Sequence, residues 1–292
     1  MEKYSVLMAV YAGDKAEYVK LAIDSMKNQT VPPDEIVIVV DGPIGEDIGA
    51  ILEIEEKHEN STIFFNICRL EKNQGLANAL NVGLEICRND LVARMDADDI
   101  SLPDRCEKEL QQFEKNNRLV VCGCNLDEFE VVNECDEEEN NCKEKQERKI
   151  KIATSRIVPE ENEEIRRFMK KRQPVNHPTV MYRKSAVQQV GGYVTLRRKE
   201  DFDLFSRMIS AGYEFYNVQE HLYLYRIDEN NYRRRKSWQN CKSALYVYLR
   251  HLRRGGCNLA QYIEICCGEI VFFLLPYSIM KFLSDKLLRS KK

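Results

Sequence analysis

The sequence contains little glycine and proline, with 13 and 8 of these residues in a chain of 292. Disordered and low-complexity chains are usually much richer in these two residues, whereas 43% of this chain is hydrophobic. The composition therefore predicts an ordinary globular protein. The length suits one large α/β domain, or one domain with a substantial appendage.

The C-terminal segment lacks an apolar run long enough to cross a membrane. Its uninterrupted uncharged stretch, Ile270–Met280, is shorter than the roughly 20 residues that a spanning helix needs, and Pro276 interrupts it. The first residues, "MEKYSVLMAVYAG", also lack the basic region, apolar core and cleavage site of a signal peptide. We therefore expect a cytoplasmic protein.

The eleven cysteines do not predict a disulfide framework, because such frameworks belong to small secreted chains. Reduced thiols are expected instead. Four of the cysteines, Cys122, Cys124, Cys135 and Cys142, could be considered as a zinc cluster. However, their spacing matches no paired C-x-x-C pattern, and "VVCGCNL" alternates like a strand.

The net charge of -3 hides a strong asymmetry. Residues 1–146 hold 15 basic and 32 acidic residues, whereas residues 147–292 hold 29 basic and 15 acidic ones. The acidic half should repel nucleic acid, and the basic half could face an anionic surface. No nucleic-acid-reading module accompanies the basic residues, so we expect no nucleic-acid partner.

Strand-like and helix-like periods alternate along the first 125 residues. The patterns predict strands over Tyr4–Val10, Asp34–Gly42, Thr62–Ile67, Leu91–Met95 and Leu119–Asn125. They predict helices over Asp14–Gln29 (with Asp14 as a candidate N-cap), Gly45–Lys57, Asn73–Arg88 and Asp104–Asn116. Such alternation predicts an α/β fold with a mostly parallel sheet and helices on both faces.

Three polar residues follow the ends of predicted strands. Tyr11, Asp41 and Asp96 each come just after such a strand. Ligands of parallel sheets bind beyond the carboxyl ends of the strands, so these three positions should converge on one crevice.

An unusual cluster of aspartates lies at the fourth of these strand ends. "LVARMDADDISLPDR" places Asp96, Asp98 and Asp99 within four positions. Carboxylates this close repel one another unless a cation lies among them, and Mn²⁺ or Mg²⁺ prefers oxygen ligands together with substrate phosphates. The alternative is a polar loop with Asp99 capping the next helix. The strand end and the other convergent positions favour a metal–nucleotide site.

The chain resembles the family 2 glycosyltransferases of the GT-A fold that serve bacterial capsule, O-antigen and exopolysaccharide synthesis. The resemblance covers residues from about 5 to 226. It rests on "SVLMAVYAGD", "IVIVVDG", "EKNQGLANALNVGL", "ARMDADDISLPDR", "HPTVMYRKSAVQQVGGY" and "KEDFDLFSRMISAGY". It implies a GT-A fold, Rossmann-like with a mostly parallel central sheet, followed by a C-terminal helical tail.

This resemblance implies roles on the nucleotide-sugar side of the site. Asp41 would accept a hydrogen bond from the base, and Asp96 and Asp98 would form the D-x-D element that grips ribose and metal, with Asp98 as the stronger choice of ligand. Asp99 would contact the sugar or support the ligands. The remaining donor-side residues would line the pocket: Val10, Tyr11, Asn73, Gly75 and His177.

On the acceptor side, the resemblance implies a catalytic pair. Asp201 would be the catalytic base, and Glu200 would contact the acceptor or the sugar. The alternative for Asp201 is a capping role at the start of the following helix. One departure concerns the metal: the family often carries a histidine shortly after the "YR" that follows the base helix, whereas this chain has Asp228 there. Asp228 could be a further metal ligand.

The domain division follows from these assignments. Residues 1–232 would form the catalytic domain, with a nucleotide-sugar half at 1–125, an acceptor and catalytic-base half at 150–232 and a polar loop at 134–149. Residues 233–292 would form a basic amphipathic helical tail, with 13 basic and three acidic residues. An interfacial helix on an anionic membrane surface fits this tail, and so does a helix packed on the domain.

The expected activity is inverting transfer of a hexose from a nucleotide-sugar, with UDP as the default nucleotide, to a saccharide acceptor. A membrane-bound tail would suit an acceptor on a lipid carrier and a peripheral location on the inner membrane face. Two alternatives stay open. One is a metal-dependent phosphohydrolase with Asp96 as nucleophile, although Ile100 does not fit its D-x-D-x-[TV] motif. The other is a non-catalytic, membrane-associated nucleotide-binding subunit.

Overall fold

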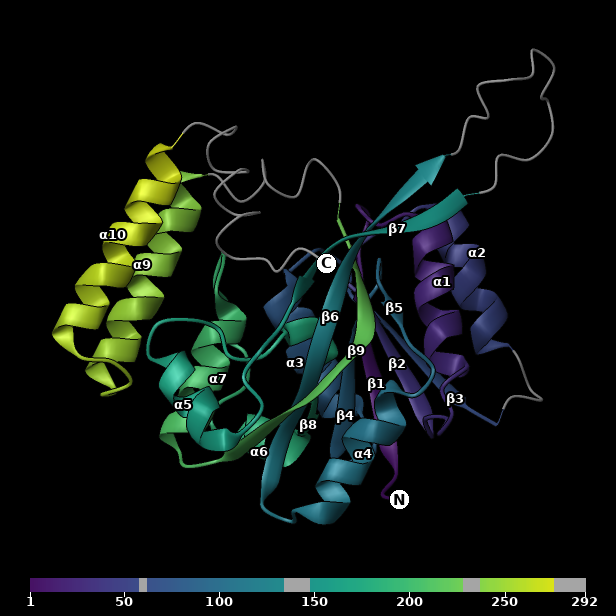
Figure 1. Ribbon diagram of the computed structural model, residues 1–292. Helices are drawn as coiled ribbons and strands as arrows, with labels where there is room; N and C mark the ends of the chain where they lie inside the picture. The colour runs from purple at the N-terminus through teal and green to yellow at the C-terminus, as the bar shows by residue number, and fades with distance from the viewer. Residues whose placement is uncertain (58–61, 134–147, 228–236, 276–292) are drawn as a thin grey trace, which may run out of the picture.

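A computed structural model describes residues 1–57, 62–133, 148–227 and 237–275 of the chain (Figure 1). The first half contains β1 (Tyr4–Val10), α1 (Ala16–Lys27), β2 (Glu35–Val40), α2 (Glu46–Glu56), β3 (Phe64–Arg69), α3 (Leu76–Ile86), β4 (Leu91–Asp96), β5 (Ile100–Ser101), α4 (Arg105–Lys115) and β6 (Leu119–Asn133). The second half contains β7 (Arg148–Arg156), α5 (Asn162–Met169), the 3₁₀ turn η1 (His177–Thr179), β8 (Met181–Arg183), α6 (Lys184–Gln189), α7 (Glu200–Ser210), β9 (Glu214–Arg226), α9 (Trp238–Arg253) and α10 (Leu259–Leu274).

One mixed sheet organises the described residues, in the order β3-β2-β1-β4-β8-β6-β9-β5, with β7 paired to β6. The strands β3, β2, β1 and β4 are parallel, whereas β8 joins β4 and β6 in antiparallel fashion. The predicted α/β architecture with a parallel sheet is therefore confirmed for the first half. In the rest of the sheet, β6 and β9 pair in parallel, whereas β8, β7 and β5 pair with their neighbours in antiparallel fashion.

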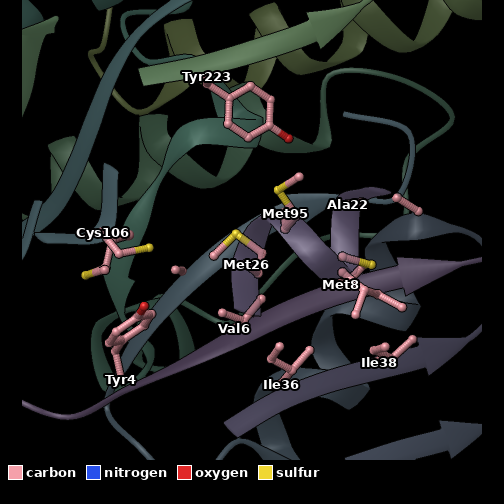
Figure 2. Close-up of a cluster of buried hydrophobic side chains, with 14 of the residues drawn as sticks. Tyr4, Val6, Met8, Ala22, Met26, Ile36, Ile38, Met95, Cys106 and Tyr223 are labelled. Atoms are coloured by element: carbon pink, nitrogen blue, oxygen red, sulfur yellow. The ribbon is translucent and has the colours of Figure 1, made fainter. Parts of the chain in front are cut away.

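Two hydrophobic clusters cover the two faces of the sheet because successive strand residues point to opposite sides. In β1, Val6 and Met8 belong to the cluster under α1, α2 and α4. Leu7 belongs to the cluster formed with α3, α5, α6, α7 and α9. Figure 2 shows the first cluster, in which Met26 of α1 lies over the side chains of β1 and β2.

Two details differ from the sequence expectations. The N-cap of α1 is Lys15, and Asp14 instead accepts a hydrogen bond from the main-chain N–H of Tyr11 at 2.9 Å. Asp14 therefore stabilises the β1–α1 loop rather than the helix end. In addition, β6 continues beyond Asn125 to Asn133, because β7 pairs with this extension.

The C-terminal helices α9 and α10 lie side by side, and α9 packs against α7 (Figure 1). Ala244, Val247 and Tyr248 of α9 belong to the same core cluster as Phe202 and Phe205 of α7. In contrast, α10 contains no fully buried residue. No helix in the described ranges combines the length and apolar character that crossing a bilayer requires.

Candidate active site

The carboxyl ends of β1, β2 and β4 bring the three predicted strand-end positions together. Val10 pairs with Val40, and Ala9 pairs with Asp96 in the parallel register. The main-chain N–H of Asp41 donates to the carbonyl of Val10 at 2.7 Å. The predicted convergence at one edge of the sheet is confirmed, although Asp96 ends β4 rather than following it.

Asp41 joins this edge to the segment before α3. Its two carboxylate oxygens accept the main-chain N–H groups of Gln74 and Gly75 at 2.7 and 2.8 Å, and the Asn73 amide donates to its carbonyl at 3.1 Å. Gly75 has a φ of 88°, a conformation that favours glycine. Asp41, Asn73 and Gly75 thus form one connected unit, and their assignment to the nucleotide pocket stays a prediction.

The first strand contributes two residues with different environments. The Val10 side chain is buried in the core cluster beneath the sheet, so its contribution to this edge is its main chain. Tyr11 is exposed and lies in the β1–α1 loop. Their assignment to the nucleotide pocket stays a prediction.

The three aspartates of the D-x-D segment form a compact group. Asp96, Asp98 and Asp99 each offer one carboxylate oxygen, and these oxygens lie within 4.8 Å of one another. Burial, followed by repulsion from Asp96, raises the pKa of Asp98 to about 6. Burial and the neighbouring Asp98 and Asp96 raise the pKa of Asp99 well above its usual value. A cation placed among them would relieve both effects.

Arg94 is a site residue that the sequence interpretation missed. It lies inside β4 with its side chain buried, and its guanidinium forms a two-pronged ion pair with Asp96. The signal was visible, since a charged residue interrupts the otherwise apolar "LVARM". A buried cation beside three carboxylates reduces their mutual repulsion and fixes the orientation of Asp96.

Arg226, which ends β9, is a second missed residue. Its main-chain N–H donates to Asp99 at 2.7 Å, and its guanidinium donates to the carbonyl of Asp98 at 2.7 Å. The guanidinium also lies over the ring of Tyr18 at 3.8 Å. These contacts hold the aspartate loop in place, although Arg226 lies 127 residues after Asp99 in the sequence. Asp228, two residues further on, lies outside the described residues.

The predicted catalytic pair begins helix α7, where the helix dipole favours negative charge. Asp201 accepts hydrogen bonds from the main-chain N–H of Phe202 at 2.7 Å and from the side-chain amide of Gln173 at 3.1 Å. Burial, with the charge of Asp201, raises the pKa of Glu200 to about 7. The sequence interpretation also missed Gln173, which orients Asp201, because a single glutamine in a loop belongs to no recognisable sequence motif.

The guanidinium of Arg94 influences both the aspartate group and the catalytic pair. The positive charge of Arg94 acts on both Asp98 and Glu200, opposing the rise in pKa that burial causes in each. The aspartates of β4 and the start of α7 therefore share one electrostatic environment, although about 100 residues separate them in the sequence.

His177 is buried near this region. Its Nε2 lies 2.8 Å from the Tyr193 hydroxyl, and its ring packs against Phe205. Burial, followed by the charge of Arg94, lowers the pKa of His177 well below its usual value, so the ring is neutral at neutral pH. Its predicted contact with a sugar stays a prediction.

The cysteines of the described residues form no disulfide. Nine of them are free in the described residues, as expected, and Cys122 and Cys124 are buried in β6, which confirms the predicted strand. Cys135 and Cys142 lie outside the described residues. The group of three possible metal ligands found in the described part of the chain is Asp96, Asp98 and Asp99.

Comparisons with known proteins identify the family of this chain. The model for the family "Glycosyl transferase family 2" matches residues 5–191. The chain is 31% identical to the amylovoran biosynthesis glycosyltransferase AmsE of Erwinia amylovora, over 97% of this chain and 98% of the relative. It is 30% identical to the UDP-Gal:alpha-D-GlcNAc-diphosphoundecaprenol beta-1,3-galactosyltransferase of Escherichia coli, over 98% of this chain and 97% of the relative.

The fold also matches solved structures. The mannosyltransferase PcManGT from Pyrobaculum calidifontis, solved in complex with GDP-Man and Mn2+, superposes with a TM-score of 0.59 over 98% of this chain and 80% of that one, at 13% identity. This similarity shows the GT-A fold. The matching family model and the relatives matched over nearly their full length show that the chain is a glycosyltransferase and belongs to glycosyltransferase family 2.

Proposed function

We propose that this glycosyltransferase moves a hexose from a UDP-sugar to a saccharide acceptor on a lipid carrier, with inversion at the anomeric carbon, in cell-surface polysaccharide synthesis. The observation that carries the proposal is the compact group of Asp96, Asp98 and Asp99 at the end of β4, in which buried Arg94 forms an ion pair with Asp96. A donor held at the aspartates would present its sugar toward the start of α7.

The aspartate group fits a divalent cation. Its oxygen ligands suit Mn²⁺ or Mg²⁺. Burial, followed by the charges of neighbouring aspartates, raises the pKa values of Asp98 and Asp99, and a bound cation would oppose both effects. Asp98 would be the direct ligand, and Asp96, oriented by Arg94, would contact metal and ribose. The cation would act as a Lewis acid on the diphosphate leaving group. The E. coli relative, by its name, uses UDP-Gal, which supports UDP here.

Asp201 would take the proton from the acceptor hydroxyl. The hydroxyl oxygen then bonds to the anomeric carbon, while the bond from that carbon to the phosphate oxygen breaks and its electron pair leaves with the nucleoside diphosphate. A base opposite the leaving group produces inversion. General-base catalysis of this kind contributes roughly 10²–10⁴-fold. Gln173 and the N–H of Phe202 keep Asp201 in one orientation.

The lipid-linked acceptor and membrane contact are supported by α10. Its exposed apolar side chains, at helical spacing, are Leu259, Ile263, Ile270, Val271 and Leu274. Such a stripe can enter the interfacial region of a bilayer. The E. coli relative is named for a diphosphoundecaprenol acceptor. We therefore propose peripheral attachment to the inner membrane face through residues 233–292.

The first test measures nucleoside diphosphate released from a panel of UDP-, dTDP- and GDP-sugars, each with Mn²⁺, with Mg²⁺ and with a chelator. Metal-dependent release from a UDP-hexose is expected, and a lipid-linked saccharide acceptor should accelerate it. Release from another nucleotide-sugar alone would overturn the choice of UDP.

A second measurement covers the case in which no release is seen without acceptor. Calorimetric titration of UDP with and without Mn²⁺ would then be decisive for the metal–nucleotide site. No metal-dependent binding of any nucleotide would contradict the proposed site. Binding without transfer to any saccharide acceptor would favour the non-catalytic subunit, and release of inorganic phosphate from simple phosphate esters would favour the phosphohydrolase.

A further inference from the structure

The residue before the catalytic pair has an unusual backbone conformation. Lys199 has a φ of 71°, and it is the non-glycine residue with positive φ among the described ranges. A non-glycine residue in this left-handed region is strained, and the conformation persists only when its surroundings over-determine it. The contacts of Lys199 therefore need to be traced.

Those contacts come from α9 and α10, not from the rest of the sheet domain. The Lys199 ammonium donates to the Tyr248 hydroxyl at 2.9 Å and lies 3.2 Å from a carboxylate oxygen of Glu269. The Tyr248 hydroxyl donates to the same carboxylate at 3.3 Å. Glu269 is 15% exposed and Lys199 22%, so water screens this three-membered contact only partly.

The preceding residue is held by the same helices. The main-chain N–H of Arg198 donates to the Ser243 hydroxyl at 3.2 Å, which in turn donates to the Arg198 carbonyl at 2.9 Å. The Arg198 guanidinium lies 3.9 Å from Glu269. The segment that leads into Glu200 and Asp201 is thus held by contacts of its main chain and of its side chains.

A second buried contact prevents α7 from sliding along α9. The carboxylate of Asp203, fully buried on α7, forms an ion pair with Arg254, which directly follows α9, at 2.5 Å and with Arg207 at 2.9 Å. Ser206 of α7 lies 2.6 Å from the Nδ1 of His251. These contacts fix the middle of α7. The contact of Lys199 with Glu269 and Tyr248 then sets the position of the first turn of α7.

We infer that the α9–α10 hairpin is a positioning element of the active site, in which Glu269 and Tyr248 hold Lys199 and thereby set where Glu200 and Asp201 meet the acceptor. This inference rests on the proposed role of Asp201 as base. Misplacing a catalytic group by about 1 Å can cost about 100-fold in rate, so a contact outside the reacting atoms can control turnover.

The test compares Glu269→Gln with Glu264→Gln, in which an exposed glutamate of the same helix loses its ion pair with Lys171. Glu269→Gln should lower kcat by about 10- to 100-fold while the KM for the nucleotide-sugar changes less than twofold. Glu264→Gln should leave both constants near those of the unmodified chain. Lys199→Gly, which relaxes the backbone but removes the side chain, should lower kcat similarly without lowering the melting temperature.

A double variant and an activity-independent measurement complete the test. Lys199→Met combined with Glu269→Gln should be no slower than the worse single variant, because both changes break one contact. Hydrogen exchange at the amides of residues 200–202 should accelerate in Glu269→Gln and not in Glu264→Gln. This exchange reports positioning even if the unmodified chain transfers no sugar, so failure of the proposed function is recognised separately.

Three results would overturn the inference. The first is a kcat of Glu269→Gln within twofold of the unmodified chain. The second is a loss of kcat that Glu264→Gln reproduces. The third is unchanged exchange at residues 200–202 in Glu269→Gln.

Discussion

Arg94 and Asp96, two residues apart on β4, point to the same face of the sheet and form a two-pronged ion pair at the strand end. This pairing places a buried positive charge within range of Asp98 and Glu200 as well. The arginine is therefore as central to the site as the aspartates beside it.

Replacing Arg94 with methionine should destabilise the protein. Asp96 would then lie beside Asp98 and Asp99 without a compensating cation, and breaking such a pair costs up to about 3 kcal/mol. The pKa of Asp98 should rise further above about 6, because the Arg94 charge opposes the effects of burial and Asp96. Urea unfolding at pH 7 and pH 5 tests this. The loss of stability should be smaller at pH 5, because that pH lies below the pKa of about 6 of Asp98.

The matched control is Arg88→Met. Arg88 lies on the surface, with its guanidinium over the ring of Phe64 and 3.8 Å from Glu35. A loss of stability at Arg94 no larger than that at Arg88, or equal at both pH values, would contradict the assigned electrostatic role.

Asp98 should govern both metal binding and the pH dependence of stability. Its pKa is raised in the folded state to about 6, so its contribution to stability is present at low pH and is lost as pH rises toward and through 6. Without metal, the melting temperature of the unmodified chain should therefore fall over this range. Asp98→Asn should reduce that fall and stabilise the metal-free protein at pH 7 by roughly 1–3 kcal/mol.

Added Mn²⁺ should raise the melting temperature more at pH 7 than at pH 5, because protons compete with the metal for the carboxylates. This difference should disappear in Asp98→Asn and persist in Asp24→Asn, which removes a surface carboxylate paired with Lys20. An equal metal effect at the two pH values would place the cation elsewhere.

Asp201→Asn should separate chemistry from donor binding. The amide keeps the shape of the side chain but cannot accept the acceptor proton, so kcat should fall by roughly 10²–10⁴-fold while the dissociation constant of the nucleotide stays near normal. Single-turnover kinetics and calorimetry measure the two quantities. Turnover that survives the substitution would require another base.

Glu200→Gln provides the comparison. Glu200 has a pKa raised to about 7 by burial and by Asp201. If it contacts the acceptor, its substitution should raise the KM for the acceptor and alter the pH profile near neutrality. A larger loss of kcat in Glu200→Gln than in Asp201→Asn would reverse the two assigned roles.

The exposed face of α10 should bind anionic vesicles. Ile263→Gln with Val271→Gln removes two exposed apolar side chains, and burial of such a side chain is worth about 1.5–3 kcal/mol. Sedimentation with vesicles containing anionic lipid should therefore weaken by more than tenfold. Ile54→Gln on α2, at an exposed isoleucine outside the tail, is the control; equal binding by both variants would remove α10 from the membrane proposal.

The sequence predicted the parallel part of the fold well because its information is local. The strands β1, β2 and β4 are short apolar runs of the kind that buried parallel strands require, and amphipathic segments between them form α1, α2 and α3. The same locality explains the errors. Asp14 matched an N-cap pattern, but in the folded loop its carboxylate accepts a hydrogen bond from the main-chain N–H of Tyr11 instead.

The site residues follow the same division. Asp41 and Asp96 were predictable because parallel strands place their carboxyl ends at one edge. Gln173 and Arg226 were not predictable, because each reaches the site through a tertiary contact. Gln173 contacts Asp201, 28 residues away in the sequence, and Arg226 contacts Asp99, 127 residues away.

The sequence by itself determined the order of the main strands and helices along residues 1–125, the aspartate group at the end of β4 and the acidic pair that begins α7, because all of these depend on neighbours along the chain. Tertiary structure alone decided that Arg94 acts on both carboxylate groups and that Glu269 of α10 contacts Lys199. The physical reason is that Coulomb interactions and hydrogen bonds depend on distance in space, which folding sets and residue spacing does not.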